Sequence, residues 1–338
     1  MPDKVSVIIP CRNEGQTIRL VLAAFSAQTY PQDLMEIIIV DGLSEDNTRS
    51  EIMAFSQEHP ELTIRIVDNP KRIIPAAVNA GILASSGDIL VRMDAHSIPQ
   101  PDYVERCVAA LAEGRADNVG GVWDIKPLVN TWMARSIATA ASHPLAVGGA
   151  QYRFSDKAQY VDTVPYGSFR KALIERIGGF DESLLTNEDY EFNTRIHLNG
   201  GKVWLDPTIR CTYFARKNLK ELSKQYWRYG FWKSQMLKRY PGTLRWRQAL
   251  PPLFVLSLVI LLILALFLPL ARWLLAAEFM IYAVALLAVG IQLAIKHRDG
   301  GMLMGIPLAI ACMHFSWGLG FIFGILSSKP SKKSGKAK

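Results

Sequence analysis

Two aspartates follow predicted strands, at positions where an open parallel sheet would place ligand-binding residues. Asp41 and Asp94 each follow a short run of mainly β-branched and apolar residues, 36–40 and 89–93. If both runs are strands of an open parallel sheet, their carboxyl ends meet in one ligand-binding crevice. Either aspartate could instead cap the turn that follows it, and the residues alone leave the two roles open.

His96 adds a second donor two residues beyond Asp94. A carboxylate and an imidazole at this spacing can face the same side and, with diphosphate oxygens and water, hold Mg²⁺ or Mn²⁺. The usual role of a loop histidine is hydrogen bonding alone, so that alternative stays open. The first turn, residues 11–15, lacks G-x-G-x-x-G, and no Walker loop occurs. A bound nucleotide would therefore need another partner for its phosphates.

A second acidic group, Glu188 and Asp189, follows Thr186 and Asn187 directly before a helical pattern. One interpretation is an ordinary helix start, with a capping residue and acids favoured by the helix dipole. That interpretation explains the composition completely. The other is that one acid faces the crevice and does chemistry, and spacing alone does not say which.

The elements that must position these residues alternate along the first half of the chain. Strand patterns cover 5–10, 36–41, 63–67 and 89–94, with helical patterns near 17–28, 47–57, 75–85 and 102–113. This alternation predicts a doubly wound, mostly parallel α/β sheet covered on both faces. Beyond it we expect helices near 131–142, 170–177 and 187–199 and a strand at 202–206.

The last third of the chain is basic and then apolar. Residues 218–240 have an amphipathic helical pattern suited to lying on a membrane. Three apolar segments follow at 252–271, 273–295 and 302–326, each near the roughly 20 residues that a membrane span needs. Glycines at 318, 320 and 324 predict close helix packing in the third.

We expect three membrane spans, although this number conflicts with the positive charge of the C-terminal tail. If the N-terminal domain stays in the cytoplasm, three spans put the tail 329–338, with its five lysines, outside, against the positive-inside tendency. Either the tail breaks that tendency or one apolar segment is re-entrant or interfacial.

Composition narrows the class of protein. The 338 residues are 50% apolar and 20% charged, with a net charge of +8. Ten Lys and Arg against one acid lie in 216–247, so the remaining main domain is mildly acidic. This location favours anionic lipid headgroups over nucleic acid. The four cysteines are far apart, as in a reduced compartment, and the first apolar run is too short for a signal peptide.

Six ordered blocks together resemble family 2 glycosyltransferases with the fold called GT-A. They are VSVIIPCRNE at 5–14, VDGLSEDNT at 40–48, AVNAGI at 77–82 with SGD at 86–88, MDAH at 93–96, GGFDE at 178–182 with NED at 187–189, and QYWRY at 225–229. His96 stands where the family has the second aspartate of Asp-x-Asp, and Tyr229 where its Gln-x-x-Arg-Trp motif has tryptophan. The Asp-Ala-His variant at 94–96, the stretch 161–170 and the C-terminal apolar segments most resemble the succinoglycan-type glucosyltransferases of bacterial exopolysaccharide assembly.

The resemblance implies roles residue by residue. Asp189 is the catalytic base with Glu188 beside it, and Asp94 and His96 hold Mg²⁺ or Mn²⁺. Gln225, Arg228 and Tyr229 serve the acceptor or diphosphate side. The nucleotide sugar is bound by Pro10, Arg12, Glu14, Asp41, Asn79 and Asp94.

The implied activity is inverting transfer of a sugar, glucose by resemblance, from a UDP-sugar to a polyprenyl-diphosphate-linked saccharide. The expected location is the bacterial inner membrane, with the catalytic domain cytoplasmic, exopolysaccharide assembly proteins as partners and no nucleic acid. Alternatives are a polyprenyl-phosphate glycosyltransferase, a short processive synthase, or a catalytically silent nucleotide-binding membrane partner. The expected organisation is a nucleotide-sugar half (1–125), an acceptor half (126–215), a basic interfacial segment (216–247), a membrane region (248–328) and the tail (329–338).

Overall fold

The computed structural model describes residues 3–327, and the predicted lysine-rich tail lies outside them. These residues form two compact units. The first contains residues up to 124 together with 151–213, and the second contains 125–150 together with 214–327.

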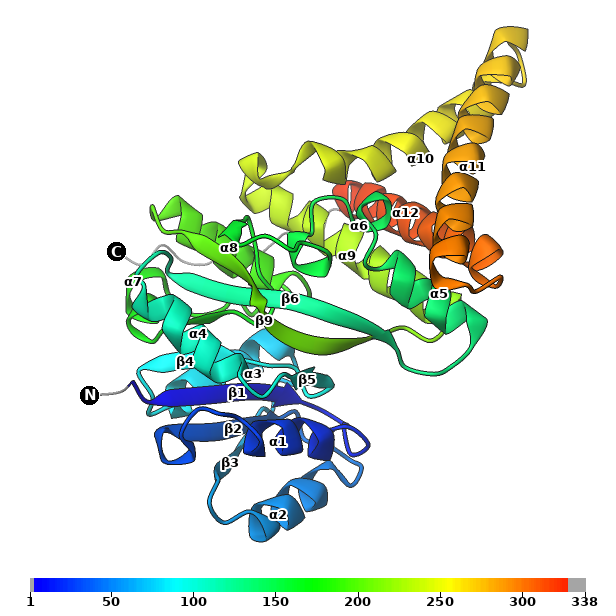
Figure 1. Ribbon diagram of the computed structural model, residues 1–338. Helices are drawn as coiled ribbons and strands as arrows, with labels where there is room; N and C mark the ends of the chain where they lie inside the picture. Colours follow the sequence, from blue (N-terminus) through cyan, green and yellow to red (C-terminus); the bar gives the residue numbers. More distant parts are fainter. Residues whose placement is uncertain (1–2, 328–338) are drawn as a thin grey trace. The chain divides into compact units, whose positions relative to one another are not determined.

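A mixed nine-stranded sheet forms the centre of the first unit (Figure 1). Its order is β3-β2-β1-β4-β8-β6-β9-β5, and β7 pairs with β9. The strands are β1 (Val5–Cys11), β2 (Met35–Asp41), β3 (Thr63–Asp68), β4 (Ile89–Arg92), β5 (Ser97–Pro99), β6 (Asn118–Pro127), β7 (Gln159–Tyr160), β8 (Ser168–Arg170) and β9 (Val203–Ala215).

The four strands predicted in the first half are confirmed, and they pair in parallel. Strands β1 and β2 are buried along their whole length, which explains why they read as unbroken β-branched runs. Beyond β4 the pairings of β8 with β4 and β6, and of β9 with β5 and β7, are antiparallel. The prediction of a mostly parallel sheet therefore describes only the first half.

Strand β6 was not predicted, because its glycines weaken the apolar pattern. The reason for glycine is steric: a Cβ on Gly121 would lie 1.8 Å from the carbonyl oxygen of Ile209 in β9. A Cβ on Gly120 would lie 2.6 Å from Cβ of Val164. Here glycine permits close approach of neighbouring backbones.

The predicted helices of the first unit form within a few residues of their expected bounds. They are α1 (Ile18–Ser26), α2 (Thr48–Glu58), α3 (Ile74–Ala84), α4 (Tyr103–Ala112), α7 (Ala172–Ile177) and α8 (Glu188–Leu198). One apolar core joins α3 and α8 to the sheet, with Ile82, Phe192 and Phe180 among its buried members. This core fixes α8, and with it the acidic pair at its start.

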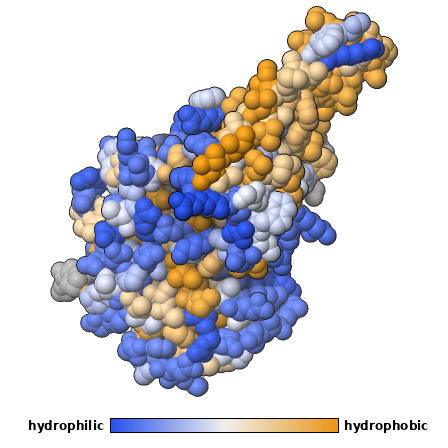
Figure 2. Space-filling model, turned by 45° about the vertical axis from the view of Figure 1, so that its right-hand side comes forward, coloured by the Kyte–Doolittle hydropathy of each residue, from blue (hydrophilic) through white to orange (hydrophobic). Residues whose placement is uncertain are grey.

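The second unit is helical. It contains α5 (Trp132–Ala140), α6 (Pro144–Val147), α9 (Leu219–Arg239), α10 (Trp246–Leu264), α11 (Pro269–His297) and α12 (Met302–Leu326). Helices α10, α11 and α12 are each long and apolar enough to cross a membrane. Figure 2 shows the broad hydrophobic surface that this part of the chain presents.

Helix α9 forms where the amphipathic pattern predicts it, but its apolar residues face protein. Leu222 and Tyr226 belong to the buried core that includes residues of α12, and Met236 is buried as well. The predicted close packing by glycines of α12 is confirmed, since a Cβ on Gly320 would lie 2.2 Å from the carbonyl oxygen of Trp227 in α9.

Candidate active site

The carboxyl ends of β1, β2 and β4 lie next to one another at one edge of the sheet. The parallel register pairs Cys11 of β1 with Asp41 of β2. Strand β4 is the other neighbour of β1, and Asp94 follows it after one residue. The prediction that Asp41 and Asp94 share this edge is therefore confirmed by the register.

Asp41 is fully buried, and its carboxylate is bound by groups of its own loop and of α2. It accepts hydrogen bonds from the backbone N–H of Ser44 (3.1 Å), from the Ser44 hydroxyl (2.5 Å) and from Nε of Arg49 (2.6 Å). Burial alone would raise the pKa of the Asp41 carboxyl, but the bonds from Ser44 and Arg49 outweigh burial and lower it. Asp41 is thus an anion that organises the loop, as well as a candidate ligand.

Arg49 is a residue that the sequence reasoning missed. It joins two strand ends, because it pairs with Asp41 at the end of β2 and with Asp68 at the end of β3. Its position one residue into α2, directly after the acidic loop, was the available signal.

The loop after β1 is tied to the loop after β2. Asn13, in a left-handed conformation (φ 57°), donates its backbone N–H to the Ser44 hydroxyl, and Glu14 donates its own to the Thr48 hydroxyl. Arg12 lies 3.7 Å from a carboxylate oxygen of Glu45. The structure therefore brings the predicted residues Pro10, Arg12 and Glu14 to the same edge as Asp41.

Asn79 has a different setting. Its side-chain amide donates to the carbonyl oxygen of Phe180 (2.9 Å) and accepts from the N–H of Phe180 (2.7 Å). It also donates to Glu182 (3.2 Å). These bonds join α3 to the loop before α8, so the observed contacts of Asn79 are structural, and its nucleotide-binding role stays a prediction.

Arg92, the last residue of β4, gathers three carboxylates around one guanidinium. Its Nη2 contacts Oε1 of Glu188 at 2.9 Å and Oδ1 of Asp94 at 3.2 Å, and its Nη1 donates to Oδ1 of Asp189. Asp94 and the acidic pair of α8 therefore share one cation, Arg92. Spacing along the chain had left open whether these groups meet.

The centre of this cluster is buried, whereas Asp94 and Asp189 are partly exposed, so the charge balance of the cluster is important. Arg92 is 4% exposed and Glu188 is 7% exposed. Burial alone would lower the pKa of the Arg92 guanidinium, but Asp94 and Glu188 outweigh it, so the pKa is raised and the group stays charged. One guanidinium faces three carboxyl groups, and this excess of acidic groups suits a cation or a proton acceptor.

Arg92 was also missed, although the sequence contained a signal. An arginine in a strand whose other residues are Ile89, Leu90 and Val91 needs a buried partner. Distant residues supply those partners, and only the tertiary structure identifies them.

Helix α8 places Glu188 and Asp189 by buried polar contacts. Asn187 adopts a left-handed conformation (φ 67°), and its side chain does not cap the helix. The capping part of the helix-start interpretation is therefore not seen, whereas both acids do lie in the first turn, where the helix dipole favours them. Further along, Arg195 binds Glu191 (2.7 Å) and the carbonyl oxygens of Ile177 and Gly179, which fixes the helix to the preceding loop.

His96 follows Asp94 at the sheet edge, and its ring contacts the edge of Tyr213 with 6.3 Å between centroids. Within residues 3–327, no group of three or more His, Cys, Asp and Glu side chains is arranged to hold a metal. One carboxylate and one imidazole are nonetheless oxygen and nitrogen donors suited to Mn²⁺ or Mg²⁺. They fit a metal whose remaining ligands come from substrate oxygens and water.

The three predicted acceptor-side residues lie on α9, in the second unit. Gln225 donates its side-chain amide to the hydroxyl of Tyr229 at 2.9 Å, one helical turn away, and Arg228 is exposed on the same helix. They are therefore not among the side chains that Arg92 assembles in the first unit.

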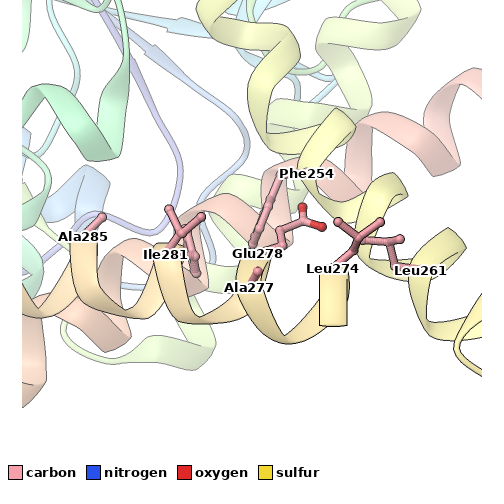
Figure 3. Close-up of a pocket in the computed structure, with 8 residues that line it drawn as sticks. Phe254, Leu261, Leu274, Ala277, Glu278, Ile281 and Ala285 are labelled. Atoms are coloured by element: carbon pink, nitrogen blue, oxygen red, sulfur yellow. The ribbon is translucent and has the colours of Figure 1, made fainter. Parts of the chain in front are cut away.

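The second unit also contains a groove between α10 and α11, of about 540 Å³ (Figure 3). Its lining is apolar except for Glu278 and the hydroxyl of Tyr282. Glu278 accepts a hydrogen bond from Ser257 of α10 (2.5 Å), which satisfies a polar group in otherwise apolar surroundings.

Known proteins resemble this chain over nearly its full length. The succinoglycan biosynthesis protein ExoA of Rhizobium meliloti is 30% identical over 319 residues, which are 93% of each chain. A Methanococcus voltae enzyme, dolichyl N-acetyl-alpha-D-glucosaminyl phosphate 3-beta-D-2,3-diacetamido-2,3-dideoxy-beta-D-glucuronosyltransferase, is 28% identical and aligns with 97% of this chain and 99% of its own.

Solved structures agree on the fold. The mannosyltransferase PcManGT from Pyrobaculum calidifontis, solved with GDP-Man and Mn²⁺, has a TM-score of 0.58 at 22% identity and covers 93% of this chain and 87% of its own. This likeness confirms the predicted GT-A architecture. The model of the family described as glycosyl transferase family 2 matches residues 6–178, which hold the sheet edge with Asp41 and Asp94. The chain therefore belongs to glycosyl transferase family 2.

Proposed function

We propose that this protein is a membrane-anchored, inverting glycosyltransferase that moves glucose from UDP-glucose to a polyprenyl-diphosphate-linked saccharide during exopolysaccharide biosynthesis. The observation that carries the chemistry is the position of Asp189, which shares the buried Arg92 with Asp94 at the nucleotide edge of the sheet. A proton acceptor beside a nucleotide site is what direct transfer to a hydroxyl needs.

The reaction is a single displacement. The acceptor hydroxyl oxygen attacks C1 of the donor sugar, the bond between C1 and the diphosphate oxygen breaks, and UDP leaves with that electron pair. The hydroxyl proton passes to the carboxylate of Asp189, and the configuration at C1 inverts. Glu188 is held by Arg92 at 2.9 Å and keeps the start of α8 in place.

Asp94 and His96 are the residues that would hold the divalent ion. Such an ion supplies Lewis-acid stabilisation of the charge that develops on the diphosphate. The Mn²⁺ named for the Pyrobaculum calidifontis structure supports this assignment.

The choice of acceptor rests on the relatives and on the membrane helices. The Methanococcus voltae relative is named for a dolichyl-linked sugar phosphate, and the Rhizobium meliloti relative for succinoglycan. Three apolar helices follow the catalytic unit, so a lipid-linked acceptor is the substrate class that this anchor favours. The same features support a bacterial inner membrane location with the catalytic unit in the cytoplasm.

The full chain, purified in detergent, tests the proposal with UDP-sugars and a polyprenyl-diphosphate saccharide as acceptor. We expect labelled lipid whose mass increases by one hexose. Asp189→Asn should slow single-turnover transfer by at least about 100-fold, because proton acceptance is typically worth 10²–10⁴ in rate, while UDP affinity persists.

Glu113→Gln is the matched control, because Glu113 is an exposed acid at the end of α4 that pairs only locally with Arg115. It should transfer like the wild type. Binding of UDP without turnover of any UDP-sugar would favour the silent partner instead, and products longer than one added sugar would favour a processive synthase.

A further inference from the structure

Helix α12 is covered by protein much more than the two apolar helices before it. In its apolar window 44% of the residues are buried, against 11% in α10 and 11% in α11. The two less covered helices form a hairpin whose turn is residues 265–268. The cover on α12 must therefore come mainly from elements outside this hairpin.

Helix α9 supplies most of that cover, and it touches α12 backbone to backbone. A Cβ on Gly230 of α9 would lie 2.1 Å from the carbonyl oxygen of Trp317. A Cβ on Gly324 of α12 would lie 2.0 Å from the hydroxyl of Ser234. No side chain fits between the helices at either point.

The two helices run parallel along the second half of α12. Near one end the thiol of Cys312 donates to the carbonyl oxygen of Leu219 (3.4 Å). At the other end Lys238 donates to the carbonyl oxygen of Ser327 (2.8 Å). At the 1.5 Å rise of an α-helix, the 15 steps from 312 to 327 correspond to roughly 22 Å of shared path.

Helix α9 cannot lie in hydrocarbon. Its 21 residues include seven charged side chains, and six of these are basic: Lys220, Glu221, Lys224, Arg228, Lys233, Lys238 and Arg239. Charged residues are strongly disfavoured at the centre of a spanning helix. Since α9 and α12 share their path, the second half of α12 must stay where α9 stays, at the water interface.

The first half of α12 is covered by a helix that also carries charge. A Cβ on Gly305 would lie 2.1 Å from the hydroxyl of Ser136 in α5. One residue earlier in α5, Arg135 pairs with Asp299, just before α12 begins, at 2.7 Å. An ion pair with a partly exposed arginine places this end of α12 at the interface too.

We propose that α12 does not cross the membrane but lies in its surface, clamped by α9 and α5, and that the chain crosses only through α10 and α11. The occupant of its uncovered face is a bilayer with anionic headgroups. That face is apolar, with Leu303, Met304, Leu308, Leu319, Phe323, Ile325 and Leu326 exposed. Exposed basic residues of the same unit match the headgroups in charge, namely Lys220, Lys224, Arg228, Arg245 and Arg247.

This topology returns the end of α12 to the side of the catalytic unit. Two crossings by α10 and α11 leave and re-enter, so Ser327 and residue 113 of α4 face the same compartment. The five lysines that the sequence places after residue 328 then obey the positive-inside tendency. The conflict seen in the sequence came from counting α12 as a span.

Cysteine accessibility in intact cells tests the topology. The background is Cys312→Ser, because the other three cysteines are buried. Ser327→Cys should react with an impermeant maleimide to the same extent as Glu113→Cys, whichever side that is. Leu266→Cys, in the turn between α10 and α11, should show the opposite accessibility. If Ser327→Cys instead matches Leu266→Cys, α12 crosses the membrane and the proposal fails.

A depth measurement tests the occupant separately. A spin label at Leu319→Cys, in vesicles of phosphatidylcholine and phosphatidylglycerol, should report a position at the headgroup boundary. A label at the bilayer midplane would contradict the proposal, and so would strong coupling to a second label, which would show that another copy covers this face. Neither result depends on glycosyl transfer, so failure here leaves the proposed reaction standing.

Discussion

At the scale of single residues, Arg92 connects the two halves of the chemistry. It contacts Asp94, which follows β4, and both acids at the start of α8. An arginine can bind several carboxylates because its five donors are arranged in a plane, whereas a lysine is a point charge. The number and direction of these donors, as well as the charge, therefore determine where Asp189 is held.

We expect Arg92→Lys to keep the positive charge but to lose the planar set of donors that binds three carboxylates. Transfer should fall by at least about tenfold, a barrier increase of about 1.4 kcal/mol, while UDP affinity changes less. Single-turnover rates and UDP titration of the same samples measure the two effects. Arg176→Lys, at an exposed pair with Asp117, is the control. Equal losses for both variants would show that Arg92 has no special role.

Asp41 gives a pH prediction at the same scale. Because its folded pKa is lowered, it contributes stability above the ordinary aspartate pKa of about 3.9, and this contribution is lost as pH falls through the lower folded value. Asp41→Asn should cost about 1–3 kcal/mol at neutral pH, since it leaves Arg49 and Ser44 poorly paired. The deficit should shrink in acid. Unfolding at pH 7 and pH 3 measures both, and an equal deficit at both values would contradict this account.

At the scale of elements, α8 and α9 are held in position by polar and small residues. In most helices a periodic apolar face has this role. Helix α8 has buried Glu191, Asn193 and Thr194, and its amide and guanidinium contacts fix the acidic pair. Helix α9 uses Gly230 against α12. Such contacts form in only one geometry. They therefore restrict the position and rotation of a helix more than an apolar face does.

Close packing between α9 and α12 predicts a steric result. Gly320→Leu should destabilise the protein by at least about 1–3 kcal/mol, the usual cost of overpacking, because the backbone of Trp227 cannot yield to the new side chain. Thermal unfolding in detergent measures it. Gly300→Ala is the control, since no atom outside its immediate chain neighbours lies within 4 Å of a Cβ there. A wild-type melting temperature for Gly320→Leu would mean that the two helices are not in contact.

At the scale of the whole chain, the catalytic unit is built from segments on both sides of an inserted helical stretch. Residues 125–150 belong to the second unit, and the chain then returns to the sheet at 151. The predicted acceptor half, residues 126–215, was expected to belong wholly to the catalytic domain, whereas residues 125–150 belong to the second unit. Segments of the sheet unit and of the helical unit therefore alternate along the chain.

Much of this arrangement was determined by the sequence alone. The buried runs of β1 and β2 predict strands because a parallel sheet covered on both faces needs continuous apolar residues. Their shared carboxyl edge follows from strand direction, so Asp41 and Asp94 could be placed together in advance. Apolar length likewise predicts three helices that are long enough to span a membrane.

The tertiary structure decided which distant groups meet. Arg92 and Asp189 are 97 residues apart in the sequence, yet the fold brings the start of α8 to the end of β4. Gly320 and Trp227 are 93 residues apart, and their close contact distinguishes α12 from the two less covered helices before it. The local sequence pattern predicts whether a segment is a helix or a strand and which face it buries. It does not predict which distant residues come into contact, because those contacts depend on how the elements pack together.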